Sequence, residues 1–384
     1  MKDKLQLMIP GPTPVPERAL LAMAKHPIGH RSKAFSDTIA AVTAGLRWLH
    51  QTQNDVFILS ASGTGAMEAG LVNVLSPGDR VLCGVNGKFG ERWADMADVF
   101  GLQCERIESE WGTPYSVEAF AEKLQADTAR AIKAVILTHS ETSSGVQNDV
   151  EAIAKLAQEH GEALVIVDAV TSLGAASVPM DEWGLDIVAS GSQKGYMMPP
   201  GLGFVAVSDR AMAATQTSTL PKYYWSFAMA KKNLSKNTTP FTPAVNLIYA
   251  LQETLTMMQE EGLEAIFARH ALLRDATRAG ARALGLGLLA PDSHPSSAVT
   301  AIEAPAGINA DDIRSLVMKK FDIALAAGQN QLKGKIFRIG HLGFICDRDI
   351  LTTFAALESA LREVGYEGFS PGAGVTAAAR VLAG

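Results

Sequence analysis

Ala163-Leu-Val-Ile-Val-Asp168 and Ser190-Gly-Ser-Gln-Lys-Gly195 are the two stretches that decide the fold. The first is an all-apolar run closed by an acid, which is the pattern of a buried strand that ends at a charged site. The second places Lys194 between small residues, 26 positions after Asp168, where we expect its amine to stay accessible and reactive. The pair predicts an amine at the end of one buried strand and a carboxylate at the end of another.

These are the two protein groups that pyridoxal 5′-phosphate chemistry requires. The cofactor needs a Schiff-base lysine and a carboxylate that keeps its pyridine nitrogen protonated. Taken alone, Lys194 also fits a solvated lysine in a Gly-rich turn. The combination with Asp168 favours the reactive lysine over that alternative.

The overall composition is that of an ordinary soluble globular protein, with 384 residues, 47% hydrophobic residues, a net charge of −6 and a pI near 5.8. The negative charge argues against a nucleic-acid or anionic-membrane partner. The first ten residues have too short an apolar stretch for a signal peptide. No apolar run approaches the roughly 18 residues of a membrane span. We therefore expect a cytoplasmic protein.

Metal and disulfide chemistry are not indicated. The three cysteines, Cys83, Cys104 and Cys346, show no Cys-x-x-Cys spacing and are odd in number. His26 and His30 form the only i,i+4 histidine pair, and the proline and glycine between them argue against a shared helical face. We read both histidines as loop residues and expect no metal site.

Residues 55–207 alternate short apolar runs with helical stretches, which predicts a doubly wound α/β domain. Continuous apolar runs are typical of a sheet that is covered on both faces. The expected strands are 55–60, 80–85, 131–138, 163–168, 186–190 and 203–207. The expected helices between them are 65–75, 92–100, 117–124 and 150–160.

After Pro240 and Pro243 the pattern changes to that of a second, α+β domain. Its expected elements are helices 245–260 and 263–285, strand 298–303, helix 310–320, strands 322–325 and 336–341, and helix 348–364. We place a large cofactor-binding domain at 17–244, and an N-terminal arm at 1–16 that joins a small C-terminal domain at 245–384.

Two terminal segments have their own composition. Pro10-Gly-Pro-Thr-Pro-Val-Pro16 is rigid and extended, which suits a segment lying across a domain or subunit boundary. The Ala- and Gly-rich tail after Gly368 is expected to be a loosely packed end.

Three further motifs follow expected strands. Ser62-Gly-Thr-Gly-Ala-Met-Glu68 opens a helix, where small residues and the helix N-terminus suit a phosphate. Its last residue, Glu68, stands where a dinucleotide fingerprint needs glycine. Phe89 has glycines on either side, which suits a ring that stacks on a flat ligand. The hydroxyls of 138–146 can bond a ring hydroxyl and a substrate.

Each of these motifs has a structural alternative: a capped turn, a packed core aromatic and a polar turn. Their convergence is the stronger argument. Ligands of open α/β sheets bind outside the carboxyl ends of the strands, and all of these motifs follow strand ends.

Arg338 lies inside the apolar strand Ile336-Phe-Arg-Ile-Gly-His341. An arginine at such a position needs a partner. A substrate carboxylate held bidentately is the functional candidate, and an internal salt bridge is the alternative.

With these motifs in place, the whole chain resembles the class V, fold-type I pyridoxal-phosphate aminotransferases, in their alanine/serine–glyoxylate branch. The stretches that carry the resemblance are Pro10-Gly-Pro-Thr-Pro, Gly63-Thr-Gly-Ala-Met-Glu-Ala, Ser76-Pro-Gly-Asp, Glu141-Thr-Ser-Ser-Gly-Val, Asp181-Glu-Trp-Gly-Leu-Asp, Gly191-Ser-Gln-Lys and Arg338-Ile-Gly-His-Leu-Gly. Some close cyanobacterial members are labelled soluble hydrogenase small subunits, although nothing in this sequence supports hydrogen chemistry.

The resemblance implies a role for each matching residue. Lys194 would bind the cofactor covalently, and Asp168 would pair with the pyridinium nitrogen. The remaining implied contacts are Phe89 and Val170 on the two ring faces, Ser62, Gly63, Thr64 and Gln193 on the phosphate together with Thr242 of the partner subunit, Thr142 on the ring hydroxyl, and Arg338 on the α-carboxylate of the substrate. The role of Thr239 stays open, because some relatives have an aromatic residue there.

We therefore expect a homodimeric aminotransferase with a pyridoxal 5′-phosphate cofactor, which moves an amino group from serine or alanine to glyoxylate or a similar 2-oxo acid. Aspartate is an open alternative as the donor. A desulfurase or lyase of the same fold would need a cysteine before Arg338, and residues 326–335 contain none. A non-catalytic subunit of a redox complex is the remaining alternative.

Overall fold

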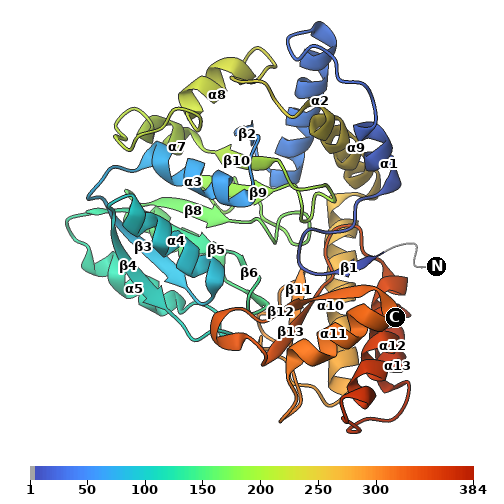
Figure 1. The fold of residues 1–384 in the computed structure, drawn as a ribbon. Coiled ribbons are helices and arrows are strands. Elements are labelled where there is room, and N and C mark those ends of the chain that lie inside the picture. Colours follow the sequence, from blue (N-terminus) through green and yellow to red (C-terminus); the bar gives the residue numbers. More distant parts are fainter. Residues whose placement is uncertain (1–4) are drawn as a thin grey trace.

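The computed structural model describes residues 5–384 and arranges them around two sheets (Figure 1). The first four residues of the predicted arm lie outside the described residues. The larger sheet has seven strands in the order β2 (Asp55–Leu59), β10 (Gly203–Val207), β9 (Ile187–Gly191), β8 (Leu164–Asp168), β5 (Ile132–Thr138), β3 (Arg80–Val85) and β4 (Gln103–Glu108). Only β10 runs antiparallel to its neighbours, so the other six strands end at one edge.

Alternating residues of the large sheet enter two separate hydrophobic cores, because successive side chains of a strand point to opposite faces. Val135 and Leu137 of β5 pack with helices on one face, whereas Ala134 and Ile136 pack on the other. The first face is covered by α2 (Lys33–His50), α5 (Val117–Ala126), α6 (Val150–His160) and α9 (Val245–Glu261). The second is covered by α3 (Gly63–Val74), α4 (Lys88–Val99), α7 (Asp209–Ala214) and α8 (Phe227–Leu234). Both faces of the sheet are therefore buried, as the apolar runs predicted.

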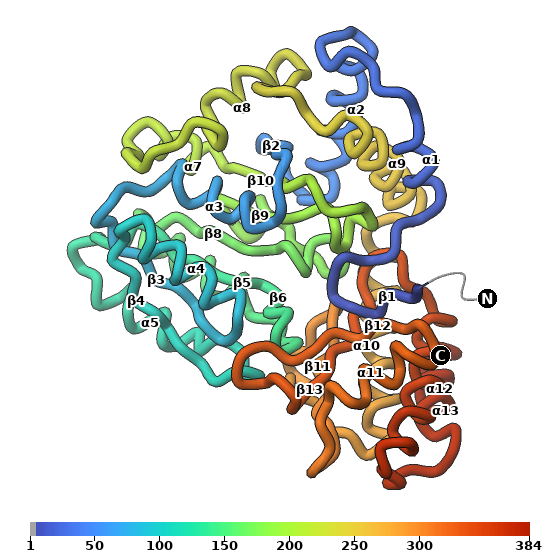
Figure 2. The backbone as a smooth tube through the Cα atoms, in the orientation of Figure 1, coloured from blue at the N-terminus to red at the C-terminus, as the bar shows by residue number. Residues whose placement is uncertain are grey.

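The smaller sheet has the order β1 (Gln6–Met8), β12 (Ile323–Ala327), β13 (Ile336–Gly340) and β11 (Val299–Glu303). Its helices are α10 (Leu263–Ala283), α11 (Ala310–Phe321), α12 (Asp347–Glu363) and α13 (Ala373–Leu382), with a 3-10 turn at η1 (Asn330–Leu332). The N-terminal strand β1 pairs in parallel with β12, and the chain then passes to α1 (Glu17–Met23), which packs on α9 (Figure 2). The 10–16 segment thus connects the two sheets.

The predicted strands of the large sheet are confirmed, each within one residue at either end. The sequence did not indicate β4, which is an edge strand with mostly polar, partly exposed side chains. It also did not indicate the two-residue strands β6 (Ser140–Glu141) and β7 (Val146–Gln147), which form a hairpin after β5. Helix α4 begins at Lys88, four residues before the predicted start.

The expectation of a loosely packed C-terminal tail is wrong. Residues 373–382 form α13, which packs on α10 and α12. Glu358 of α12 accepts hydrogen bonds from the backbone amides of Gly372, Gly374 and Val375, at 2.6, 2.9 and 3.2 Å. A Cβ atom on Gly374 would lie 3.0 Å from Leu284, so the small residues of this tail allow close helix packing.

Candidate active site

Five strand ends bring the predicted site residues to one edge of the large sheet. Ser62 follows β2, Phe89 follows β3, Thr142 follows β5, Val170 follows β8 and Lys194 follows β9. Asp168 is the last residue of β8. Since these strands all run in the same direction, their carboxyl ends form a common rim, which is where α/β sheets bind ligands.

Lys194 is buried rather than accessible, with 8% of its surface exposed. The N-terminal arm covers it, because Lys194 Nζ donates a 2.6 Å hydrogen bond to the carbonyl oxygen of Pro10. A Cβ atom on Gly11 would lie 2.7 Å from the lysine side chain, so glycine there makes the close approach possible. Burial lowers the pKa of Lys194 to about 8, against the opposing field of Asp168. The neutral, nucleophilic form of the amine is therefore much easier to reach near neutral pH than for an ordinary lysine, although the protonated form still predominates at pH 7.

Asp168 is equally buried, at 3% exposed. Its Oδ1 accepts a 2.8 Å hydrogen bond from the backbone amide of Val170. Burial raises its pKa to about 6, although this hydrogen bond and the positive field of Lys194 oppose the shift. Within residues 5–384 no cation pairs with it inside 4 Å. A cationic ligand atom beside it would restore the ionised carboxylate.

The start of helix α3 has donors available for an anion. Ser62 is the N-cap residue but its side chain makes no capping hydrogen bond, which leaves the first amides of the helix without that acceptor. A Cβ atom on Gly63 would lie 2.8 Å from Val170 Cγ2, so only glycine allows this helix start to approach the β8 end so closely. Gln193 is also at this rim, and its buried Oε1 has no hydrogen-bond partner.

Arg92 belongs to this group, although sequence reasoning missed it. Its NH1 donates a 2.9 Å hydrogen bond to Thr64 Oγ1. Its guanidinium lies over the ring of Phe89, with the carbon 4.7 Å from the ring centroid. The positive charge of Arg92 also lowers the pKa values of both Asp168 and Lys194. The i,i+3 spacing from Phe89 along α4 was the available signal, since residues so spaced share one helix face.

Arg338 has no acidic partner in the described chain, so the salt-bridge alternative is not observed. Its Nε and NH2 donate to the carbonyl oxygen of Ala327, at 2.9 and 2.7 Å. Its NH1 donates to the carbonyl oxygen of Thr142, at 2.8 Å. Burial lowers its pKa to about 10, while Glu141 opposes that shift. Arg338 is thus a buried cation held by neutral acceptors, and the hydroxyl of Thr142 bonds that of Thr171 beside it, at 2.7 Å.

Thr242 is the predicted residue that a single chain does not bring to the rim. It is exposed and lines a small pocket at the end of β2 together with Thr239. No hydrogen bond joins it to the other predicted residues in the described chain. Thr239 is buried, and its hydroxyl donates to the carbonyl oxygen of Phe241 at 2.7 Å. Both roles therefore remain predictions.

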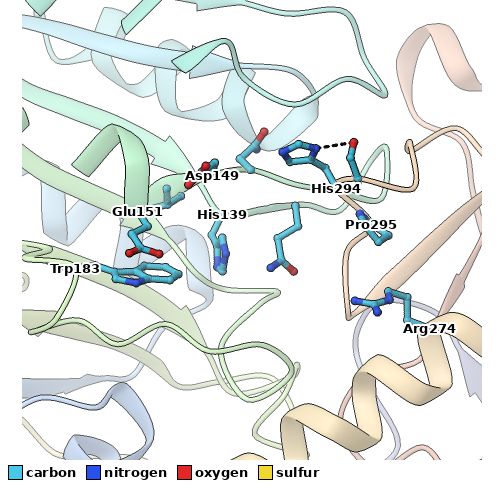
Figure 3. Close-up of a pocket in the computed structure, with 11 residues that line it drawn as sticks. His139, Asp149, Glu151, Trp183, Arg274, His294 and Pro295 are labelled. Carbon is cyan, nitrogen blue, oxygen red and sulfur yellow. Dashed lines mark hydrogen bonds between the residues drawn. The ribbon is translucent and has the colours of Figure 1, made fainter. Parts of the chain in front are cut away.

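A separate polar cavity of about 330 Å³ lies beside the β6–β7 hairpin (Figure 3). His139 and Trp183 form one wall, with an edge-to-face ring contact at 5.6 Å, and Arg274 of α10 lies opposite. Burial lowers the pKa of His139 to about 4, so its ring is neutral near pH 7. None of the predicted cofactor or substrate residues lines this cavity. The candidate site is the rim around Lys194.

Within the described part of the chain, no group of three or more His, Cys, Asp or Glu side chains is placed to hold a metal ion. Among the same residues, no helix is long and apolar enough to cross a membrane. His26 and His30 lie in the loop between α1 and α2, as expected.

Comparison with known proteins adds an independent observation. The family model "Aminotransferase class-V" matches residues 12–341. A Synechococcus protein named "Soluble hydrogenase, small subunit" is 62% identical over 100% of this chain and 99% of its own length. An L-aspartate–glyoxylate aminotransferase of Paracoccus denitrificans is 39% identical, over 98% of this chain and 96% of its own. The crystal structure of an alanine–glyoxylate aminotransferase from Nostoc sp. superposes with a TM-score of 0.90 at 32% identity, covering 94% of this chain and 96% of its own.

Proposed function

We propose that this chain, which belongs to the class-V aminotransferase family, moves an amino group from serine or alanine to glyoxylate with the help of pyridoxal 5′-phosphate. Its fold is the fold type I of the pyridoxal-phosphate transferases, and it is a transaminase. The observation that carries the proposal is a rim where Asp168, Lys194 and Arg338 are all buried and none has an oppositely charged partner within 4 Å. Such charges are costly in a folded protein unless a ligand supplies their partners.

The residues at the rim fit pyridoxal 5′-phosphate. The uncapped start of α3, the hydroxyls of Ser62 and Thr64, and the Arg92 cation suit its phosphate. Phe89 and Val170 supply an aromatic and an aliphatic surface for its ring. When bound, the cofactor supplies an electron sink for the charge that develops at the substrate Cα.

Lys194 is the group that would hold and move protons. Its pKa of about 8 gives a substantial neutral fraction near pH 7–8, so Nζ can attach the cofactor and later accept the proton from the substrate Cα. The Pro10 carbonyl that now accepts its hydrogen bond keeps Nζ oriented at the rim.

Asp168 and Arg338 would orient the two partners. Asp168, fixed by the Val170 amide, would hold the pyridine nitrogen in its protonated form. Arg338 would bind the carboxylate that serine, alanine and glyoxylate share, because its planar fork matches a carboxylate bidentately. One arginine would then serve both half-reactions.

The active form would be a homodimer with the site at the subunit interface. Thr242 is exposed and makes no hydrogen bond to the rim residues of its own chain. This suits a side chain that binds the cofactor of a second subunit. Two exposed aromatic side chains lie near it: Tyr224 stacks on Phe241, and the Tyr223 ring packs against Phe241 at a tilt. They offer a surface for the partner.

Aspartate is the second candidate donor, because the Paracoccus relative is named for aspartate and glyoxylate. Arg338 would bind the α-carboxylate in either case. The three candidate donors, serine, alanine and aspartate, differ only in the substituent on Cβ, so the choice among them depends on the surroundings of the substrate side chain.

A spectrum and an assay test the proposal. The purified protein with pyridoxal 5′-phosphate should show the visible band of a lysine-bound cofactor, at about 420 nm. It should also convert glyoxylate to glycine with serine or alanine as donor. Lys194→Ala should lose the band and at least about a thousandfold of the turnover, because the variant lacks the buried amine that attaches the cofactor and moves the proton. Retention of a few per cent of the turnover would refute the assignment of Lys194.

A further inference from the structure

The first turn of α4 is capped from outside the helix. Its N-cap residue, Gly87, has no side chain to accept the free amides that every helix start exposes. Glu141 takes this role from a segment about fifty residues away in sequence. Its Oε2 accepts hydrogen bonds from the backbone amides of Phe89 and Gly90, at 3.0 and 3.1 Å.

Ser143 completes the cap. Its hydroxyl oxygen accepts a 3.0 Å hydrogen bond from the backbone amide of Lys88. The same hydroxyl donates a 2.6 Å hydrogen bond to Glu141 Oε1, which also accepts from the Ser143 amide at 3.0 Å. Three consecutive amides at the start of α4 are therefore satisfied by two side chains of the hairpin loop.

Glu141 packs closely against Gly87 and has no cation within 4 Å in the described chain. It is fully buried. A Cβ atom on Gly87 would lie 2.3 Å from its carboxyl carbon, so the glycine gives the carboxylate its access to the helix. Burial raises the pKa of Glu141, and four hydrogen bonds from Phe89, Gly90 and Ser143 oppose that shift. The positive end of α4 also favours the carboxylate.

The two segments that Glu141 joins carry two of the predicted site residues, Phe89 and Thr142, and contact a third, Arg338. Phe89, whose amide it binds, is the predicted ring-stacking residue. Thr142 follows it directly, and the Thr142 carbonyl oxygen accepts the hydrogen bond of Arg338 NH1. A shift of the Glu141 carboxylate would thus move the ring surface, the ring-hydroxyl partner and the carboxylate-binding arginine relative to one another.

We propose that Glu141 is a positioning residue of the active site, which caps α4 and thereby fixes Phe89, Thr142 and Arg338 around the cofactor. This inference rests on the proposed function. It adds a residue that contacts neither cofactor nor substrate and acts only through the groups that do.

The chain contains a matched control. Glu358 also caps a helix start from outside, by accepting the amides of Gly372, Gly374 and Val375. It lies on α12 beside the smaller sheet, caps the start of α13, and hydrogen-bonds none of the rim residues. Glu358→Gln therefore reproduces the chemical change of Glu141→Gln without touching the site. In both variants an amide NH2 replaces an oxygen that faced N–H donors.

The first measurement is amide hydrogen exchange of the apoproteins. Glu141→Gln should speed exchange at residues 88–90 by about tenfold or more, because the negative charge is lost and one of the two oxygens that face N–H and O–H donors becomes an NH2 group. Glu358→Gln should speed exchange at 372–375 by a similar factor and leave 88–90 unchanged. Unchanged exchange at 88–90 in Glu141→Gln would overturn the cap.

The second measurement is cofactor binding and orientation. Glu141→Gln should raise the dissociation constant of pyridoxal 5′-phosphate by about tenfold, weaken the visible circular dichroism of the bound cofactor, and raise KM for glyoxylate, in line with the loss of charge-assisted hydrogen bonds. Glu358→Gln should leave all three as in the wild type. Faster exchange at 88–90 with unchanged dissociation constant and dichroism would show a structural cap only, and would overturn the positioning role.

The same set of variants also distinguishes two further outcomes: a wild type that binds no cofactor, and a Glu141→Gln variant that does not fold. If the wild type binds no pyridoxal 5′-phosphate, the proposed function fails, and the positioning role fails with it. If Glu141→Gln does not fold, Ser143→Ala decides, because it removes only the Lys88 contact and one of the hydrogen bonds to Glu141. It should show smaller changes of the same kind, with faster exchange at Lys88, and an unchanged Lys88 amide and dissociation constant would overturn the proposal.

Discussion

Buried charged side chains have different partners at the two edges of the seven-stranded sheet. At the amino edge, Asp127 accepts a 2.7 Å hydrogen bond from the Ile132 amide, forms an ion pair with Arg80 at 3.3 Å, and hydrogen-bonds the His160 ring at 3.2 Å. Asp186 at the same edge pairs with Arg210 at 3.3 Å. At the carboxyl edge, by contrast, the buried side chains of Asp168, Lys194 and Arg338 bond only neutral backbone groups.

Whether a buried charge has a charged partner distinguishes residues that stabilise the fold from residues that bind a ligand. A buried charge with its partner in place is satisfied, whereas one held by carbonyls or a single amide keeps most of its desolvation cost. The carboxyl edge of this sheet keeps that cost at Asp168, Lys194 and Arg338. A cofactor with a cationic ring nitrogen and an aldehyde, together with a carboxylate substrate, supplies the missing partners.

Among the substitutions that test this comparison, Asp168→Asn should have the largest effect on turnover. A neutral amide cannot hold the ring nitrogen protonated, so turnover should fall by about a thousandfold or more and cofactor binding should weaken. Steady-state kinetics with saturating pyridoxal 5′-phosphate measures the loss. Near-normal activity would mean that Asp168 serves the fold, like the acids at the amino edge.

The same substitution should stabilise the apoprotein near pH 7. The folded pKa of Asp168 is raised from 3.8 to about 6, so its protonated form contributes stability that is present below pH 3.8 and lost as the pH rises through 6. Above pH 6, ionisation therefore costs about 3 kcal/mol that asparagine does not incur. Urea unfolding at pH 4 and pH 7.5 tests this sign. A stability difference between variant and wild type that does not grow with pH would contradict it.

Much of the large sheet could be predicted because its signal is local. The strands are apolar runs in the sequence, and the residues after them lie at the rim because parallel strands end together. The edge strand β4 escaped prediction because Ile107 is its only buried residue, so no apolar run marks it. The tail after Gly368 was misjudged because small residues that allow close helix packing have the same composition as a loose end.

What the sequence could not show are contacts between distant segments. The start of α4 is set by Glu141, so no local capping residue marked it. The burial of Lys194 comes from the N-terminal arm, through Pro10 and Gly11. The absence of a salt bridge at Arg338 depends on which acids the fold leaves out of reach, which spacing alone does not tell.

Arg338→Lys should have the next largest effect. The variant keeps the charge and loses the fork geometry, which should cost about 2–4 kcal/mol in kcat/KM. The loss should appear for the amino donor and for glyoxylate alike, while the affinity for pyridoxal 5′-phosphate changes little. A variant impaired only with aspartate would show that Arg338 binds a side-chain carboxylate, and the donor would then be aspartate.

Asp127→Asn is the matching change at the amino edge and should act on stability alone. Burial raises the pKa of Asp127, but the Ile132 amide, His160 and Arg80 more than offset it and hold the pKa below 3.8. Loss of the carboxylate should lower the free energy of unfolding by about 1–3 kcal/mol, because these donors lose a charged acceptor. kcat/KM of the folded fraction should stay as in the wild type. A loss of activity at unchanged stability would erase the distinction between the two edges.

Arg92→Gln should have the smallest effect and would sharpen the comparison at a single residue. Arg92 is a cation at the carboxyl edge whose contacts are neutral, namely the Thr64 hydroxyl and the Phe89 ring. If it supplies charge to the phosphate of the cofactor, its loss should raise the dissociation constant of pyridoxal 5′-phosphate by about fivefold to tenfold, equivalent to about 1 kcal/mol. The increase should shrink at high salt, because a half-buried charge is screened.

Arg92→Lys separates charge from geometry: it keeps the cation but not the planar contact with the ring. Equal losses in both variants would assign Arg92 to holding Phe89 in place, whereas a loss confined to the glutamine variant would assign it to the phosphate.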